Sequence, residues 1–250
     1  MSLSPEDAPT ERSTAPDAVP RGPRRGRYPP RAVDPGDGHA PVKVPAPALA
    51  AKQIARRRRV IEAALALAAK GGYEAVQMRD VAARANVALG TVYRYFASKD
   101  HLLAETLLEW TGELRARVIR NPPKGRTVAE RLIDVMNRLC DAVESELDLS
   151  AAFIRALQSP EPAVTEAFLQ VGDQLEAMCD EVLGDLDPDV RDEVFMVIEH
   201  VWHSTMQGWA NGRHPLSYTR DQLEMVIRLI FERAPVIAVA VGGRRSAATR

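Results

Sequence analysis

The sequence predicts an all-α fold. From residue 51 onward, apolar residues recur at spacings of three and four, which is the period of a helix with one buried face. No window alternates between apolar and polar residues for long enough to indicate a strand. Glycine, proline and asparagine interrupt the helical pattern where turns are expected. The first predicted buried face contains Ile54, Ile61, Leu65 and Ala68.

Composition divides the chain into four parts. Residues 1–50 hold eleven of the eighteen prolines and show no apolar periodicity, so we expect a disordered tail rich in proline and arginine. Residues 235–250 are expected to form a second, frayed tail. Between the tails, we expect an N-terminal helical domain at 51–101 and a larger helical domain at 102–234.

Residues 51–101 predict three helices and the start of a fourth. Gly71 and Gly72 end the first helix, because glycine adopts left-handed backbone angles without a Cβ clash. Asn86 suits a tight turn, since its short side chain tolerates the same angles. The other predicted helices are Met78–Ala85 with Val81 and Ala82 inward, Leu89–Phe96 with Val92 and Phe96 inward, and Lys99–Ile119 capped by Ser98.

Residues 102–234 predict five further helices after a break at Asn121–Gly125. Thr127 and Glu130 have the spacing of a capping box. Pro162 and Pro188 suit first helical turns, where a missing N–H costs nothing. The expected ranges are Thr127–Ser145, Leu149–Leu157, Pro162–Leu183, Pro188–Ala210 and Thr219–Arg233.

Charge is distributed unevenly along the chain. Residues 51–101 contain ten Lys and Arg against four Asp and Glu, whereas residues 102–250 contain sixteen against twenty-four. This asymmetry indicates that the first helical domain meets a polyanion and that the second does not.

Export and membrane insertion are not expected. The longest apolar run, Val236–Val241, is far shorter than the ~20 residues that span a bilayer, and the N-terminus lacks the apolar core of a signal peptide. Cys140 and Cys179 form no metal-ligand cluster and fit a reducing compartment, where a disulfide between them is not expected. We therefore expect a cytoplasmic protein.

Residues 76–103 predict a helix-turn-helix, whose second helix enters the major groove of DNA. Gly90 removes a side chain where backbone and phosphate approach, and Thr91 offers a hydroxyl and a methyl to a phosphate or a thymine. Arg94 suits a base or a backbone contact. The candidate DNA-binding residues are Gln77, Arg79, Leu89, Gly90, Thr91, Tyr93, Arg94, Tyr95 and Lys99, with the tyrosine hydroxyls and Lys99 directed at phosphates.

The segment GGYEAVQMRDVAARANVALGTVYRYFASKDHLL resembles the TetR-type transcriptional regulators, most strongly in GTVYRYFASKDHLL. The resemblance implies an all-helical homodimer with a three-helix DNA-binding head and a larger ligand-binding body, in which an effector changes the spacing of the two heads. Asn86 departs from the glycine of many relatives, and Ala88 and Gln77 depart from their serine or threonine. Ala88 removes a usual helix cap, at a cost of ~1 kcal/mol.

A looser resemblance, in KGGYEAVQMR, GTVYRYF and the later segment Val201–Trp209, is to actinobacterial cholesterol-catabolism repressors of the KstR kind. It implies a repressor of sterol or other lipid degradation genes that a bulky acyl-CoA releases from DNA. A helix-turn-helix homodimer reads two half-sites, so the double-stranded operator should be an inverted repeat. An activator fits the sequence as well as a repressor, since both need only DNA binding and a dimer with two states.

The predicted helices of the larger domain have apolar faces, and these faces have two possible interpretations. A sensor of an apolar effector needs a cavity with adaptable lining, which methionine and aromatic side chains provide, but the same stripes also fit simple core packing. The candidate effector-binding residues are Met136, Leu139, Cys140, Val143, Phe153, Leu157, Phe168, Leu175, Met178, Trp202, Met206 and Trp209.

The TetR resemblance also implies a dimer seam on the last two long helices. The candidates are Val194, Ile198 and Val201 on the first of these helices and Leu223, Val226, Ile227 and Ile230 on the second. Taken alone, these residues fit a core within one chain equally well.

No catalytic residue, cofactor or metal site is predicted. The sequence lacks the motifs HExxH, GxGxxG, GxxxxGKS/T and GxSxG. His200 and His203 lie three apart near Glu193 and Glu199, but one helical pair supplies at most two metal ligands. The rival hypothesis is a helical acyl-CoA or lipid-binding protein or enzyme with a vestigial DNA-binding head, in which His200, His203 and Glu199 form the reactive cluster.

Overall fold

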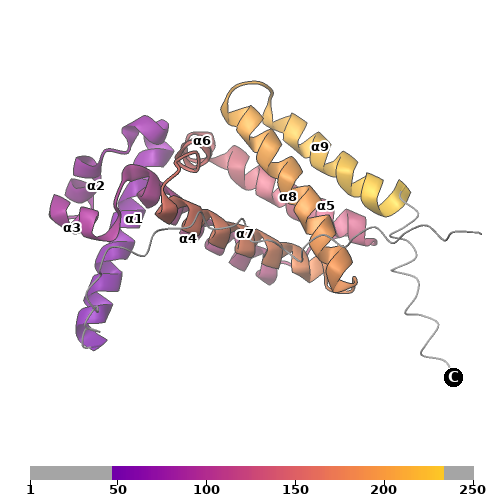
Figure 1. Ribbon diagram of the computed structural model, residues 1–250, viewed down its shortest axis with the longest axis horizontal. Helices are drawn as coiled ribbons and strands as arrows, with labels where there is room; N and C mark the ends of the chain where they lie inside the picture. Colours follow the sequence, from indigo (N-terminus) through magenta and orange to yellow (C-terminus); the bar gives the residue numbers. More distant parts are fainter. Residues whose placement is uncertain (1–46, 234–250) are drawn as a thin grey trace, which may run out of the picture. The chain divides into compact units, whose positions relative to one another are not determined.

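The computed structural model describes residues 47–233, and within them the all-α prediction is confirmed. Figure 1 shows the helices coloured along the chain, and the described residues contain no strand. Of the two predicted tails, 1–46 and 235–250 lie outside the described residues, while 47–50 already belong to the first helix.

The helices follow the predicted order, with small shifts at their ends. Pro162–Leu183 and Pro188–Ala210 match the prediction, whereas the last helix begins at Leu216 and passes into a π-helical turn. The elements are α1 (Pro47–Ala75), α2 (Met78–Arg84), α3 (Leu89–Tyr95), α4 (Lys99–Arg120), α5 (Val128–Ser145), α6 (Leu147–Ala156), α7 (Pro162–Leu183), α8 (Pro188–Ala210), α9 (Leu216–Arg228) and η1 (Leu229–Arg233).

The predicted helix ends are explained by their local chemistry. Gly72 has a φ of 64°, so the helical path of α1 is interrupted where the glycine pair predicts it. The Ser98 hydroxyl accepts a hydrogen bond from the His101 backbone N–H at 3.0 Å, which caps α4. Thr127 and Glu130 form the predicted capping box at the start of α5.

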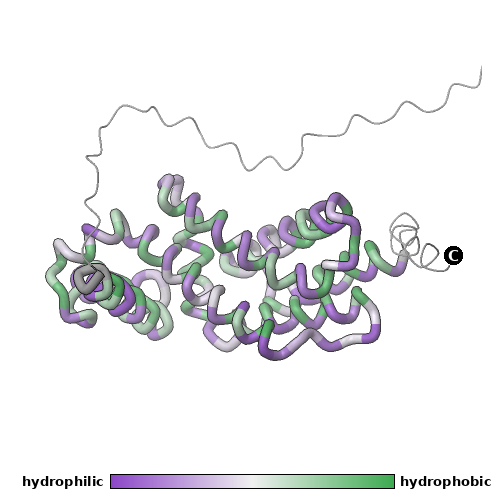
Figure 2. The backbone as a smooth tube through the Cα atoms, turned by 90° about the horizontal axis from the view of Figure 1, so that it is seen from below, coloured by the Kyte–Doolittle hydropathy of each residue, from purple (hydrophilic) through white to green (hydrophobic). Residues whose placement is uncertain are grey.

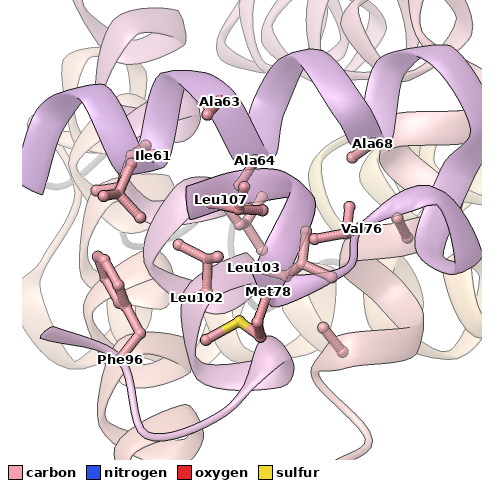
Figure 3. Close-up of a cluster of buried hydrophobic side chains, with 14 of the residues drawn as sticks. Ile61, Ala63, Ala64, Ala68, Val76, Met78, Phe96, Leu102, Leu103 and Leu107 are labelled. Carbon is pink, nitrogen blue, oxygen red and sulfur yellow. The ribbon is translucent and has the colours of Figure 1, made fainter. Parts of the chain in front are cut away.

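The first hydrophobic core, which we call the head core, joins α1–α3 to the N-terminal half of α4 and to α6. Figure 3 shows its centre, where side chains of α1 meet Phe96 and the leucines of α4. Leu149 and Phe153 of α6 belong to the same cluster. Burying a side chain as large as Phe96 stabilises the fold by about 1.5–3 kcal/mol. α6 is therefore part of the structure that supports α2 and α3.

The second core, which we call the body core, joins the C-terminal half of α4 to α5, α7, α8 and α9. Trp110 and Leu175 pack against both cores, so α4 and α7 link them. The expected domain boundary at residue 101 falls in the first turn of α4, and the head core continues past it to Leu107. Figure 2 shows that the helices carry both hydrophobic and hydrophilic residues along their length, as amphipathic helices require.

The prediction that Ile54 lies on the buried face of the first helix is wrong. Ile54 is 68% exposed, whereas Ile61 and Ala68 are buried as expected. The reason is the length of α1, because Val60 is its first buried apolar residue among those whose side chains are described and Ile54 lies more than a turn before it.

Candidate nucleic-acid interface and effector region

The turn between α2 and α3 has the geometry that the sequence predicts. Asn86 has a φ of 52°, in the left-handed region that asparagine tolerates better than most residues. The backbone N–H of Val87 donates to the carbonyl of Ala82 at 3.0 Å and closes the end of α2. Two seven-residue helices are thus joined by a short turn, as in a helix-turn-helix.

α3 has one buried side and one open side. Val92 is fully buried and Phe96, directly after the helix, is 1% exposed, which confirms the predicted inward pair. On the open side, Tyr93 is 51% exposed and Arg94 is exposed. A Cβ atom on Gly90 would meet no protein atom within 4 Å. The open side therefore offers a phenol, a guanidinium and a stretch of bare backbone to an external partner.

The start of α3 lacks a side-chain cap. Ala88 occupies the N-cap position and makes no side-chain hydrogen bond, as its departure from the relatives implies. Leu89 and Thr91 are half-buried, and Leu89 packs against the head core. Of the residues predicted for DNA contact on α3, Leu89 thus also holds the helix in place.

Gln77 and Arg79 lie at the start of α2. Gln77 is the N-cap residue, and its side-chain N–H donates to the Glu74 carbonyl at 3.0 Å. Arg79 is exposed in the first turn. Both side chains reach solvent on the same short helix that precedes the turn.

Tyr95 is tied to α1. Its hydroxyl donates to the Gln53 carbonyl at 3.4 Å and its ring is half-buried. A hydroxyl that bonds within the chain must give up that bond to contact a phosphate, so the structure uses Tyr95 to hold α3 against α1. Tyr93 is the exposed tyrosine of the pair.

Lys99 belongs to a cluster around Tyr73, which we call the Tyr73 cluster. The Lys99 ammonium lies 3.7 Å from the centroid of the Tyr73 ring, and the guanidinium carbon of Arg155 lies 4.1 Å from it. The Tyr73 hydroxyl donates to Asp100 at 2.6 Å, and Arg155 pairs with Glu74 at 2.6 Å. Because Arg155 is on α6, the cluster joins a helix of the 102–234 region to a predicted phosphate contact.

The Tyr73 cluster shifts two pKa values. Burial and the hydrogen bond to Asp100 raise the pKa of Tyr73 to about 12. Burial lowers the pKa of Lys99, and the charge of Arg155 lowers it further, while Glu74 and Asp100 raise it. No sequence pattern pointed to Tyr73 or Arg155, because residues so distant along the chain meet only through the tertiary fold.

Eleven of the twelve predicted effector-binding residues lie in or against connected apolar clusters, and Phe168 is the exception. Met136, Leu139, Cys140 and Met178 are in the body core, with Leu175 and Trp202 packed against it. Val143 and Met206 form a smaller cluster with Trp202 and Trp209 packed against it. Phe153 is in the head core, Leu157 packs against that core, and Phe168 contacts His203 at 4.8 Å between ring centroids.

Burial raises the pKa of the unpaired Cys140 and Cys179 thiols to about 11 and about 12.

An open hollow of about 340 Å³ lies between α4 and α5, and none of these predicted residues lines it. Leu114, Val118 and Ala142 give it an apolar floor. Arg138 lies at its edge, where it pairs with Asp134 at 2.6 Å and donates to the carbonyls of Asn121 and Pro122. Helical periodicity could not reveal this hollow, because it forms where the end of one helix crosses another.

Four of the seven predicted seam residues are buried within one chain. Val194, Ile198, Leu223 and Ile227 are at most 2% exposed in the body core, so a second subunit has no further surface of theirs to cover. Val201, Val226 and Ile230 are half-buried. The large apolar side chains that α8, α9 and η1 do expose are Met196, Val197, Tyr218, Met225 and Leu229.

The histidine pair of α8 makes separate contacts. A ring nitrogen of His200 lies 2.6 Å from the Met196 carbonyl, whereas the His203 ring packs edge-on against Phe168. Burial lowers the pKa of His203. In the part of the chain that the structure describes, no group of three or more His, Cys, Asp or Glu is placed to hold a metal. None of the helices at 47–233 is long and apolar enough to cross a membrane.

Two family models match the chain. The model described as "Bacterial regulatory proteins, tetR family" matches residues 60–106, which include α2 and α3. The model "Tetracyclin repressor-like, C-terminal domain" matches residues 125–230. The chain belongs to the TetR family. TetR regulators bind DNA, and α2 and α3 are the helix-turn-helix of this one.

Individual relatives agree with this assignment. The chain is 37% identical over 177 residues to the HTH-type transcriptional repressor KstR of Rhodococcus jostii, an alignment that covers 70% of this chain and 82% of the relative. A TetR regulator from Rhodococcus sp. RHA1 has a similar fold, with a TM-score of 0.65 at 23% identity over 73% of this chain and 98% of that one. Thermus thermophilus FadR, a TetR-family repressor in complex with lauroyl-CoA, gives 0.57 at 24% identity over 72% and 97%.

Proposed function

We propose that this TetR-family regulator is a homodimeric repressor that binds an inverted-repeat operator and is released by a bulky apolar effector. The observation that carries the DNA-binding part is the open side of α3, where Gly90 leaves backbone bare one turn before the exposed side chains of Tyr93 and Arg94. The similarity to KstR repressors favours repression over activation.

The effector we propose is an acyl-CoA thioester with a bulky apolar acyl group, such as a sterol-derived one. Support comes from the connected apolar clusters, in which Met136, Met178 and Met206 supply side chains that adapt to a guest. A repressor of similar fold binds lauroyl-CoA. An acyl-CoA would enter by separating the closely packed helices that form these clusters.

The dimer seam we propose uses the outward side of α8, α9 and η1. Met196, Val197, Met225 and Leu229 are each 40–55% exposed there, which leaves apolar surface for a second copy to cover. The half-buried Val201, Val226 and Ile230 are proposed to contribute from the edges of the same seam.

The substitution Gly90→Ala separates DNA binding from folding. Because the new Cβ has open space inside the chain, we expect unchanged thermal stability or a gain of up to ~1 kcal/mol from helix propensity. If DNA backbone approaches Gly90, the methyl group will lower affinity for an inverted repeat at least tenfold. Fluorescence anisotropy with the inverted repeat, a single half-site and a random duplex measures this.

Two results of that titration would contradict the proposal. One is wild-type protein that binds the inverted repeat no more tightly than the random duplex. The other is a folded Gly90→Ala protein with undiminished affinity for the inverted repeat.

The effector assignment predicts selective release. A bulky acyl-CoA, added to the complex of wild-type protein and inverted repeat, should dissociate it at concentrations where free CoA and the free acid do not. Mass spectrometry of small molecules that copurify with the protein identifies the first compounds to test. Equal release by free CoA would show that the apolar group is not recognised.

A further inference from the structure

The N-terminal half of α1 is unusually cationic. The segment 47–61 contains Lys52 and four consecutive arginines, Arg56–Arg59, and no acidic residue. Two of the arginines have partners inside the chain. Arg57 pairs with Glu105 and Glu109 of α4, and Arg58 pairs with Glu62 one turn along α1.

The other three cations, Lys52, Arg56 and Arg59, have no such partners. All three are exposed, and none makes an ion pair or hydrogen bond with another described residue. Their spacings of four and three place them on one side of the helix. They form a row roughly 10 Å long, at 1.5 Å per residue, which we call the α1 cationic stripe.

The stripe is held beside the DNA-reading helix. The Tyr95 hydroxyl at the end of α3 donates to the carbonyl of Gln53, next to Lys52. The guanidinium carbon of Arg57 lies 5.5 Å from the centroid of the Phe96 ring, and its Nη1 lies 2.8 Å from Glu109. Figure 1 shows this half of α1 continuing past α2 and α3. Contacts on the buried side of α1 thus fix the position of cations on its open side.

The arrangement is unfavourable without an external anion. Like charges at helical spacings of three and four destabilise a helix by about 0.2–0.5 kcal/mol per pair. A DNA strand offers a phosphate about every 3.4 Å along its axis, so a row of cations roughly 10 Å long spans about three of them. An anionic membrane offers charge too, but the stripe is attached to the C-terminal end of α3, whose partner is DNA.

We propose that Lys52, Arg56 and Arg59 bind phosphates of the duplex that α3 reads, in addition to any that α2, α3 and Lys99 reach. The stripe adds affinity without adding sequence preference, because phosphates are the same in every sequence. It precedes residue 60, where the match to the TetR family model begins. The inference rests on the proposed function, since α3 must lie on the same duplex.

The test compares two triple variants with the same change in charge. The stripe variant is Lys52→Gln with Arg56→Gln and Arg59→Gln, which preserves helix propensity. The control is Lys124→Gln with Arg120→Gln and Arg126→Gln, three exposed cations near the end of α4. Circular dichroism verifies that both retain helix. Anisotropy titrations against the inverted repeat and a random duplex are repeated from 50 to 200 mM salt.

We expect the stripe variant to lose up to three phosphate contacts. These are three contacts in each subunit, so a homodimer on the inverted repeat loses up to six, and the slope of log affinity against log salt would then fall in magnitude by about 5.4. This is equivalent to roughly 10³-fold less loss of affinity across this salt range. Affinity for the inverted repeat and the random duplex should drop by the same factor, and the control should keep the wild-type slope.

The outcomes separate this inference from the proposed function. A wild-type protein that prefers the inverted repeat, together with a stripe variant of unchanged slope, would overturn the inference alone. A loss confined to the inverted repeat would show base reading instead of phosphate binding. Binding of wild-type protein to anionic lipid vesicles that the stripe variant loses, with unchanged DNA slopes, would assign the stripe to a membrane instead.

Discussion

Two arginines of the body, Arg220 and Arg228, differ in their surroundings from the exposed cations of the head. In the body, Arg220 of α9 pairs with Asp141 and Glu144 of α5, and Arg228 pairs with Glu224 and Glu232, so these two arginines are neutralised within the chain. In the head, the exposed Arg79 and the α1 cationic stripe have no such ion pairs among the described residues. Arginine therefore has two uses here: Arg220 holds α9 against α5, whereas Arg79 and the arginines of the α1 cationic stripe stay available to an external anion.

The Tyr73 cluster is the exception that joins the two regions. Arg155 of α6 shares the Tyr73 ring with Lys99 and pairs with Glu74, so a cation from the 102–234 region takes part in a site of the head. Since α6 also contributes to the head core, a displacement of α6 would change both the packing beneath α3 and the surroundings of Lys99.

The largest expected effect is on the free energy of unfolding, and it appears when Arg220→Gln is compared with Arg94→Gln. Arg220 bonds to Asn137, Asp141 and Glu144 with a side chain 29% exposed, so Arg220→Gln should lower the free energy of unfolding by about 1–2 kcal/mol. Arg94→Gln, on the open side of α3, should change it by less than about 0.5 kcal/mol and instead weaken DNA binding. Urea denaturation and anisotropy measure the two quantities.

Arg220→Lys is the matched control, because it keeps the charge and loses the planar fork that reaches several acceptors. It should fall between wild type and Arg220→Gln in stability. An Arg94→Gln protein that is destabilised as much as Arg220→Gln would break the contrast between head and body cations.

Features of the fold could be predicted from the sequence where the interacting residues lie close together along the chain. Asn86, Ser98 and the Thr127–Glu130 capping box act through bonds to residues a few positions away, so their types and spacing were sufficient. The inward pair Val92 and Phe96 was predictable for the same reason.

Features that depend on distant segments were not predictable. Apolar periodicity indicated that Ile198 and Leu223 are buried, but not that the covering surface belongs to the same chain. Arg155 and Glu74 are 81 positions apart, and Tyr95 meets Gln53 across 42. Such pairs depend on how α6 and α1 pack, which no local pattern records.

The smallest expected effect concerns Arg155→Gln, which tests whether the Tyr73 cluster transmits the state of the body to the head. Removing this cation takes away the α6 contact to the Tyr73 ring and to Glu74, while Lys99 keeps its place on the ring. We expect the affinity for the inverted repeat without effector to change less than about threefold. The ratio of affinities without and with acyl-CoA should shrink by about two- to fivefold, because exposed ion pairs contribute up to about 1 kcal/mol. Arg191→Gln, which removes the ion pair with Asp180 and involves no residue of the cluster or the proposed seam, should leave the ratio unchanged. If both substitutions reduce the ratio equally, the body acts on the head through packing of α4 and α6 alone, and the Tyr73 cluster has no part in the coupling.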